Sequence, residues 1–152
     1  MTRCDVDPVD MQAAKCGKIR RLTADDVDNI MDMMEQIEEF AASYDGKREK
    51  RCEEMKMEIE AGCIAVGVFE GDKLVCQART SADNSMSAMV VGVATLEAYR
   101  GKGYATAAVK TLCREAFKSG RKFLCLFYNN PVAGRIYNRI GFKEIGEYAM
   151  FR

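Results

Sequence analysis

Apolar residues in the first third of the chain repeat at helical spacing after a short strand-like segment. The strand is expected at 19–22, and residues 23–26 (Thr-Ala-Asp-Asp) are typical of a helix start with acidic side chains in its first turn. The helix that follows carries apolar residues on one side as far as Phe40, among them a methionine cluster at 31–34. These methionines fit either a substrate-lining surface or core packing, the commoner role. A second, highly charged helix is expected at 47–61.

The middle of the chain has the composition of strands. Two segments rich in β-branched residues, 64–70 and 73–82, flank Gly71-Asp72, which predicts a hairpin. A third strand is expected at 86–95. Residues 89–93 within it are continuously apolar, so we expect this strand to be buried on both faces.

Helices and strands alternate over the last third of the chain. We expect a helix at 104–118, a buried strand at 122–128, a helix from Pro131 to Gly141, and one or two closing strands at 142–151. Hairpins followed by a βαβα unit predict an α/β (α+β) fold with a mixed central sheet, in which 86–95 and 122–128 are parallel neighbours. Ligands bind in such sheets at the carboxyl ends of the strands.

Size and charge narrow the class of protein. The 152 residues fit one domain, and residues 1–16, which show no periodicity, are expected to be a tail or linker before a domain at 17–152. Lys plus Arg and Asp plus Glu each number 23, so no net field favours a nucleic acid partner. An apolar run of about 18 residues and a signal pattern are both missing, so we expect a cytoplasmic protein without a membrane partner.

The residue types limit the chemistry. The chain has no histidine, which removes the usual zinc ligand, the usual general base and the usual partner of a catalytic serine or cysteine. Its seven cysteines form no CxxC pair and fall mostly in apolar stretches, as reduced core residues do. We therefore expect no metal site, and any catalysis must use other groups.

A glycine-containing segment joins the strand at 86–95 to the helix at 104–118. Gly101 and Gly103 allow successive N–H groups to turn into one concavity, and the helix start adds unpaired N–H groups and the positive end of its dipole. Such a junction suits a pyrophosphate, although glycines here also serve simply as turn residues. The spacing excludes a Walker-type loop, and the third glycine and downstream acidic residue of a Rossmann fingerprint are missing.

Two motifs make the sequence similar to the GNAT superfamily of acyl-CoA N-acyltransferases. Residues 100–105 (Arg-Gly-Lys-Gly-Tyr-Ala) match the signature Gln/Arg-x-x-Gly-x-Gly/Ala. Residues 130–142 match the second motif, Asn-x-x-Ala-x-x-x-Tyr-x-x-x-Gly-Phe, in the family order and with a helix and a strand between the two. The resemblance is strong over 86–142 and extends more loosely, by element order, from Lys18 onward.

The resemblance implies the single-domain GNAT fold, in which the two parallel strands splay apart and coenzyme A lies in the notch between them. Main-chain groups of Val93, Ala94 and Thr95 would pair with the pantetheine arm, as an added strand does. Asn130 would hydrogen-bond the pantetheine or order the site, and Ala133 would leave room for the cofactor. The amides that would hold the pyrophosphate belong to Arg100, Gly101, Lys102, Gly103, Tyr104, Ala105 and Thr106.

Tyr137 is the side chain to which the resemblance assigns chemistry. The matching tyrosine of the family lies near the cofactor sulfur, so Tyr137 is expected to bind the cofactor and, as general acid, to give a proton to the leaving thiolate. Without the motif, Tyr137 reads as one more half-buried aromatic that packs against Ile136 and Ile140.

The implied activity is that of an N-acetyltransferase, which moves an acetyl group from acetyl-CoA directly to a primary amine. A backbone N–H of the splayed strand would stabilise the oxyanion. A base is needed because most amines are protonated at neutral pH, yet the strand at 86–95 contains no carboxylate. Neither Glu97, Asp83 nor Glu70 is favoured for this role.

Other functions fit the same motifs. The fold also suits a non-catalytic acyl-CoA-binding or sensing module, or a cofactor-binding fragment of a larger transferase. The acceptor stays open among a small amine, an amino acid, an antibiotic and a protein amine, and acetyl is preferred over longer acyl groups by family habit alone. A homodimer is a further option, since GNAT proteins often dimerise.

Overall fold

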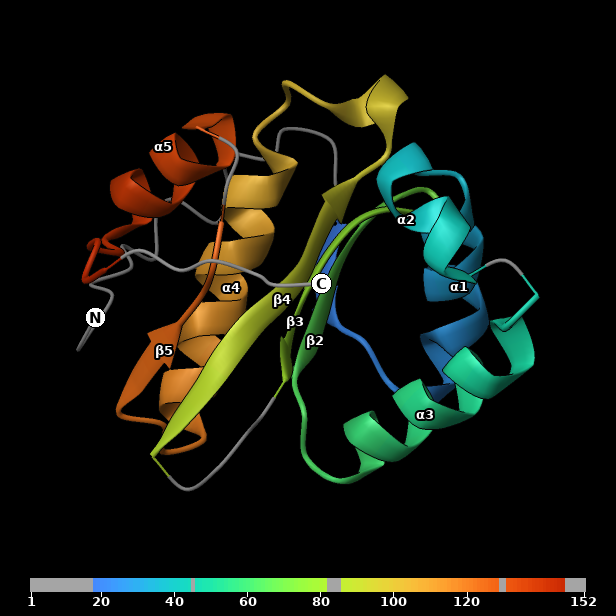
Figure 1. The fold of residues 1–152 in the computed structure, drawn as a ribbon, viewed down its shortest axis with the longest axis horizontal. Helices are drawn as coiled ribbons and strands as arrows, with labels where there is room; N and C mark the ends of the chain where they lie inside the picture. Colours follow the sequence, from blue (N-terminus) through green and yellow to red (C-terminus); the bar gives the residue numbers. More distant parts are fainter. Residues whose placement is uncertain (1–17, 45, 82–85, 129–130, 147–152) are drawn as a thin grey trace.

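The computed structural model of the chain describes residues 18–44, 46–81, 86–128 and 131–146, and it is built around a five-stranded sheet (Figure 1). In sheet order the strands are β1 (Lys18–Arg21), β2 (Ala65–Glu70), β3 (Lys73–Ser81), β4 (Ser87–Thr95) and β5 (Phe123–Cys125). The pairs from β1 to β4 are antiparallel, and β4 and β5 are parallel, which confirms the mixed sheet. The helices are α1 (Val27–Glu35), α2 (Glu38–Tyr44), α3 (Arg48–Glu60), α4 (Tyr104–Lys118) and α5 (Pro131–Ile140), with short 3-10 turns η2 (Ala24–Asp26) and η3 (Glu97–Tyr99).

Helices cover both faces of the sheet. In Figure 1, α1, α2 and α3 lie on one face and α4 lies on the other, with α5 packed beside α4. Met31, Met33 and Met34 of α1 are at most 1% exposed, so these side chains belong to the core, and Met33 also borders a pocket between α1 and the β2–β3 hairpin. Nowhere in the described ranges is a helix both long enough and apolar enough to cross a lipid bilayer.

The predicted helix start at 23–26 is confirmed, and a buried carboxylate fastens it. The backbone N–H of Thr23 donates to Asp26 Oδ2 at 2.8 Å, which completes a capping box. Arg20 of β1 donates to both oxygens of Asp26, at 2.8 and 2.7 Å. Because these bonds favour the ionised form, the Arg20 guanidinium holds the pKa of the Asp26 carboxyl below its usual range.

The single helix expected to run as far as Phe40 is wrong, because the chain breaks into α1 and α2 after Glu35. The side-chain amide of Gln36 donates to the carbonyl oxygen of Asp32 at 2.8 Å. That oxygen is the one to which the backbone N–H of Gln36 would donate in a continuing α-helix. The N–H groups of Gln36 and Ile37 donate instead to carbonyls three residues back, and the helix ends.

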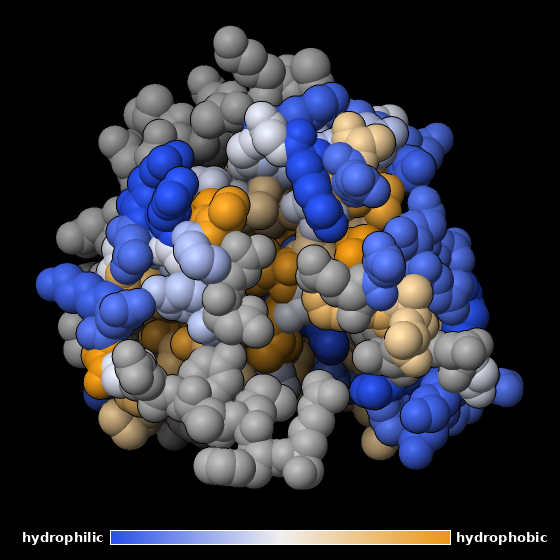
Figure 2. Space-filling view, turned by 45° about the horizontal axis from the view of Figure 1, so that its top comes forward, coloured by the Kyte–Doolittle hydropathy of each residue, from blue (hydrophilic) through white to orange (hydrophobic). Residues whose placement is uncertain are grey.

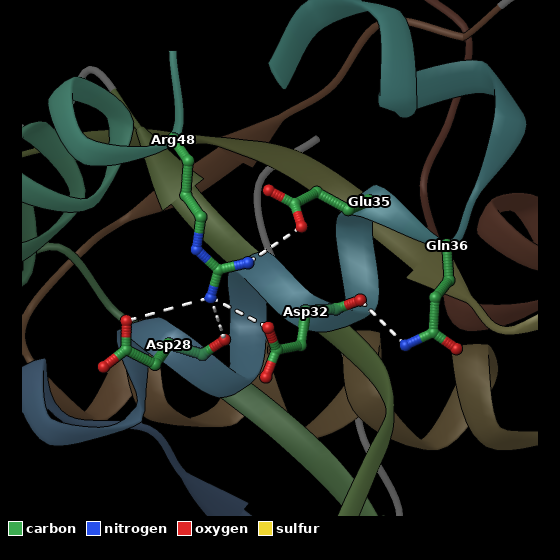
Figure 3. Close-up of polar contacts among 5 residues, drawn as sticks. All are labelled: Asp28, Asp32, Glu35, Gln36 and Arg48. Atoms are coloured by element: carbon green, nitrogen blue, oxygen red, sulfur yellow. Dashed lines mark hydrogen bonds and ion pairs between the residues drawn. The ribbon is translucent and has the colours of Figure 1, made fainter. Parts of the chain in front are cut away.

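The charged helix predicted at 47–61 is confirmed as α3, and an arginine ties it to α1. Arg48 donates to Asp32 Oδ1 and to Glu35 Oε2, both at 2.8 Å, and Asp28 lies 3.9 Å away (Figure 3). Met55 is the fully buried residue of α3, so the helix has a narrow apolar contact with the rest of the core. The arginine cluster therefore complements weak apolar packing.

The second half of the chain mostly follows its predicted elements. The hairpin at Gly71-Asp72 is confirmed, with Glu70 paired to Lys73 and Gly71 at a φ of +60°. The helices expected at 104–118 and 131–141 are confirmed as α4 and α5. The closing strand is not seen over 142–146, where the described chain has no regular structure, and the rest of that prediction lies outside the described residues.

The two parallel strands are neighbours as predicted, but they pair over a short stretch. Their register runs from Ser87 opposite Phe123 to Met89 opposite Cys125, where pairing stops. The prediction that β4 is buried on both faces is therefore wrong: residues 89, 91, 92 and 93 are half-buried. The buried strand expected at 122–128 is also too long, since β5 ends at Cys125 and Phe127 is 58% exposed.

Candidate active site

An opening in the sheet begins where β5 stops pairing with β4. Beyond Met89 the strand β4 continues to Thr95 while β5 diverges from it, as Figure 1 shows. Figure 2 looks onto the end of the molecule at which β4 finishes, and it shows a hollow with an apolar floor between hydrophilic rims. The opening thus lies at the carboxyl end of a parallel strand pair, where ligands bind in open sheets. Val93, Ala94 and Thr95 are the residues of β4 that reach this end.

A β-bulge lies in the part of β4 that does not pair with β5. Two β4 residues, Gly92 and Val93, face the single β3 residue Ala78. Gly92 has a φ of +61°, a conformation that side-chain-bearing residues rarely adopt. A Cβ atom at position 92 would also lie 2.9 Å from Nε of Arg79 and 3.3 Å from Nε2 of Gln77. Both the backbone conformation and the available space therefore require glycine at this position.

The segment after β4 turns the chain toward the start of α4. Arg100 Nε donates to the carbonyl oxygen of Thr95 at 3.1 Å, which ties the segment back to the end of the strand. Gly101 and Gly103 have φ values of +78° and +81°, and open space surrounds the position of a Cβ at each. Both glycines are therefore needed for backbone conformation rather than for room.

The N-terminus of α4 receives no side-chain cap from its N-cap residue. Gly103 is its N-cap and provides no side-chain cap, so the first N–H groups of the helix, from Tyr104 to Thr106, have no capping partner from that residue. The first turn also holds no acidic residue, in contrast to α1 and α3. Uncapped donors at the positive end of a helix dipole can hold a phosphate group. The seven residues 100–106 that the sequence assigned to the pyrophosphate are thus gathered in one loop and helix start.

Glu70 holds this loop against the β2–β3 hairpin, a role that the sequence did not reveal. The Tyr104 hydroxyl donates to Glu70, and Lys102 Nζ lies 3.4 Å from the same carboxylate oxygen. The Tyr104 hydrogen bond, and then the Lys102 charge, hold the pKa of Glu70 below its usual range. Lys102 and Lys73 also stand 5.4 and 5.6 Å from the centre of the Tyr99 ring. These contacts tie the loop to the β2–β3 hairpin.

Tyr137 projects from α5 into an aromatic cluster. Its ring centre lies 5.9 Å from that of Tyr128 and 6.0 Å from that of Phe142, and the residue is 9% exposed. Burial raises the pKa of the Tyr137 hydroxyl, so the phenol stays protonated at neutral pH. Ala133, one turn earlier on α5, is half-buried, and Asn130 lies outside the described residues. Tyr128, the other tyrosine of this cluster, hydrogen-bonds Glu144.

The carboxylates considered as general base gain no support. Glu97 is exposed in η3, and Glu70 is already committed to Tyr104 and Lys102. Asp83 lies outside the described residues. A carboxylate whose pKa is lowered by hydrogen bonding is a weaker base, so Glu70 is a structural group in this arrangement.

Comparison with known proteins agrees with this geometry. A sequence model of the acetyltransferase (GNAT) family matches residues 29–142. The chain belongs to the GNAT acetyltransferase family. No curated protein matches it in sequence. Among solved structures, a predicted acetyltransferase from Clostridium acetobutylicum with acetyl-CoA has a TM-score of 0.72 at 14% identity, over 90% of this chain and 96% of that one.

Two further solved structures share the GNAT fold of the chain. The aminoglycoside N-acetyltransferase AAC(6')-Iy in complex with CoA has a TM-score of 0.74 at 16% identity, over 90% of this chain and 93% of that one. A transcriptional regulator from Bacillus halodurans has a TM-score of 0.74 at 21% identity, over 90% of this chain and 99% of that one. The GNAT fold expected from the two motifs is therefore confirmed.

Proposed function

We propose that this GNAT protein is an N-acetyltransferase that moves an acetyl group from acetyl-CoA to a primary amine by direct transfer. The observation that carries the proposal is that β4 and β5 part after Met89 and that the chain leads from the end of β4 to the start of α4, which Gly103 does not cap by a side chain. A slot along an unpaired strand edge suits the amide groups of pantetheine, and an anion site at its end suits the pyrophosphate. The presence of acetyl-CoA or CoA in two structures of the same fold supports this co-substrate.

The cofactor contacts follow the order of the chain. Main-chain groups of Val93, Ala94 and Thr95 would pair with pantetheine, and the amides of 100–106 would take the pyrophosphate. The residues proposed to flank the arm from the other side are Asn130, Ala133 and Tyr137.

The proposed reaction forms a C–N bond and breaks a C–S bond. The neutral amine attacks the thioester carbon, and a main-chain N–H of β4 stabilises the oxyanion of the tetrahedral intermediate. Tyr137 gives its phenolic proton to the departing sulfur. The raised pKa of Tyr137 keeps the phenol protonated at neutral pH, so the proton is available for this step. The proton that the amine loses passes to water, from which Tyr137 is protonated again.

The acceptor is proposed to be a small-molecule primary amine. The aminoglycoside acetyltransferase of the same fold supports this class. The equal numbers of basic and acidic residues give no electrostatic reason to expect a nucleic acid acceptor.

Release of free thiol from acetyl-CoA tests the proposal. The panel of amines includes aminoglycosides, amino acids, polyamines and a peptide with a free N-terminus. We expect turnover above background hydrolysis with at least one amine. The Gly103→Glu variant should abolish it, because a carboxylate at the start of α4 repels the phosphates. Firm CoA binding in calorimetry without turnover on any amine would favour a sensing module, and the absence of CoA binding would overturn the cofactor assignment.

A further inference from the structure

A glutamine side chain is fully buried between the sheet and α1. Gln77 of β3 is 0% exposed. Its Nε2 atom donates to the carbonyl oxygen of Gly92 at 3.1 Å and lies 3.3 Å from Sδ of Met34. The reverse orientation of the amide would set Oε1 against the Gly92 oxygen, and because two acceptors repel, the donor orientation is fixed. The Gln77 side chain therefore holds the bulge of β4 through the carbonyl group of Gly92.

This contact fixes the direction of the next N–H group. The carbonyl of Gly92 and the N–H of Val93 belong to one trans peptide and point in opposite directions. Since the carbonyl is turned toward the Gln77 side chain, the Val93 N–H points away from that side chain. The edge of β4 opposite β3 faces β5 only as far as Met89, so at Val93 this edge borders the opening described above.

We propose that Gln77 is a positioning residue for acetyl transfer: by holding the Gly92 carbonyl, it aims the Val93 N–H at the carbonyl oxygen of the acetyl thioester. The inference rests on the proposed function, because it names the main-chain donor of the oxyanion and the side chain that orients it. Gln77 touches neither substrate, since it is fully buried behind the bulge.

The composition of the core supports a functional role for this residue. The Oε1 atom of Gln77 is buried and has no hydrogen-bond partner in the described part of the chain. A methionine has almost the same length and would fill the space without an unsatisfied oxygen, so core stability alone does not select glutamine. Cores normally contain no buried polar atom without a hydrogen-bond partner, and exceptions are expected at residues that support a functional site. Among the described residues, the main-chain group that the Gln77 side chain holds is the bulge carbonyl of Gly92.

The thioester carbonyl itself reports on the proposed hydrogen bond. Infrared difference spectra of [1-13C]acetyl-CoA bound to the protein need no acceptor, and a donor at the carbonyl oxygen lowers its stretching frequency. The test variant is Gln77→Met, which removes the amide at nearly constant volume. The matched control is Thr80→Val, another fully buried polar residue of β3, whose hydroxyl accepts from Ile64 N at 2.9 Å, away from the bulge.

We expect wild type and Thr80→Val to show the lowered frequency and Gln77→Met to lose most of that shift. CoA lacks the acetyl thioester carbonyl, so its Kd should stay within about twofold in all three proteins. With an acceptor in hand, Gln77→Met should lower kcat by about tenfold or more and leave the KM of acetyl-CoA unchanged. An undiminished shift in Gln77→Met would overturn the role of Gln77 while leaving the proposed function intact, whereas failure of wild type to bind acetyl-CoA would overturn both.

The wild-type protein provides an independent measurement in case Gln77→Met does not fold. In 15N–1H spectra, the Val93 amide proton should move downfield with acetyl-CoA relative to CoA. Identical Val93 positions with the two ligands would show that this N–H does not meet the acetyl carbonyl, which overturns the proposal.

Discussion

Replacing Gly103 by alanine isolates the contribution of backbone conformation to cofactor binding. Gly103 is the N-cap of α4, with a φ of +81°, and no atom lies within 4 Å of the position of a Cβ. The added methyl group therefore meets nothing, and its whole effect comes from the left-handed conformation, which an alanine adopts at a cost of about 1–2 kcal/mol.

The exposure of the loop decides whether the conformational cost of alanine appears in the stability of the free protein or in its affinity for CoA. Gly101, Lys102 and Gly103 are all exposed, so the ligand-free variant can relax by moving the loop. On the proposed function, CoA binding must then restore the left-handed turn, because this turn aims the amides at the phosphates. At about 1.4 kcal/mol per tenfold change in Kd, we expect CoA to bind the variant about 5-fold to 30-fold more weakly.

The other end of the same helix provides the control. Gly120 follows the C-cap of α4, with a φ of +97° and equally open space around a Cβ. Gly120→Ala carries a similar conformational cost, but position 120 lies at the far end of α4 from the loop that contains Gly103. The Kd of CoA is measured by calorimetry, and stability is measured by urea unfolding, on both variants. Gly120→Ala should unfold at lower urea concentration and keep its affinity for CoA.

Two results would refute this reasoning. If Gly103→Ala lost neither affinity nor stability, the left-handed turn would not be part of the folded loop. If Gly120→Ala lost as much affinity as Gly103→Ala, helix stability rather than loop geometry would set CoA binding.

Three further substitutions test individual groups. Tyr137→Phe should lower kcat by about 100-fold with little change in the KM of acetyl-CoA, and unchanged steady-state kinetics would remove the general-acid assignment. Tyr104→Phe removes the hydroxyl that holds Glu70 and should weaken CoA binding several-fold in calorimetry; equal affinity would show that the loop needs no such support. The lowered pKa of Asp26 contributes stability that is present above its unfolded pKa of about 3.9 and lost as pH falls through the folded pKa. Asp26→Asn should therefore destabilise by about 1–2 kcal/mol in urea at pH 7 and by much less at pH 3; a loss independent of pH would show that the charge is not the cause.

Local patterns were sufficient for elements whose ends depend on turn residues and periodicity. The hairpin at Gly71 and the helix over 104–118 are of this kind, because their start, stop and buried side are each encoded by neighbours in sequence. The conformation of the segment 100–106 belongs to the same class, since its glycines, the strand before it and the helix after it are contiguous.

The errors of prediction arise from contacts between distant parts of the chain or from competing side chains. At the break after Glu35, the side-chain amide of Gln36 donates to the carbonyl oxygen of Asp32, a contact that no periodicity encodes. β5 ends early because the chain diverges from β4 after Cys125. An apolar run in the sequence does not indicate whether a partner strand or a ligand covers it. Gln77 did leave a signal: it is the polar residue within the apolar run 74–78 of β3, which is unexpected for a core position.

The absence of histidine is consistent with a site made from main-chain groups. Three glycines with positive φ, Gly92, Gly101 and Gly103, lie between the middle of β4 and the start of α4, and each turns the backbone. On the proposed function, these turns direct N–H groups out of the regular ladder and toward the cofactor. Main-chain donors do not titrate, so on the proposed mechanism neither cofactor binding nor oxyanion stabilisation depends on pH near neutrality. The raised pKa of Tyr137 keeps the proposed acid protonated over the same range. The pH dependence of turnover should then follow the pKa of the acceptor amine, because the amine is the group that must lose a proton before it can attack.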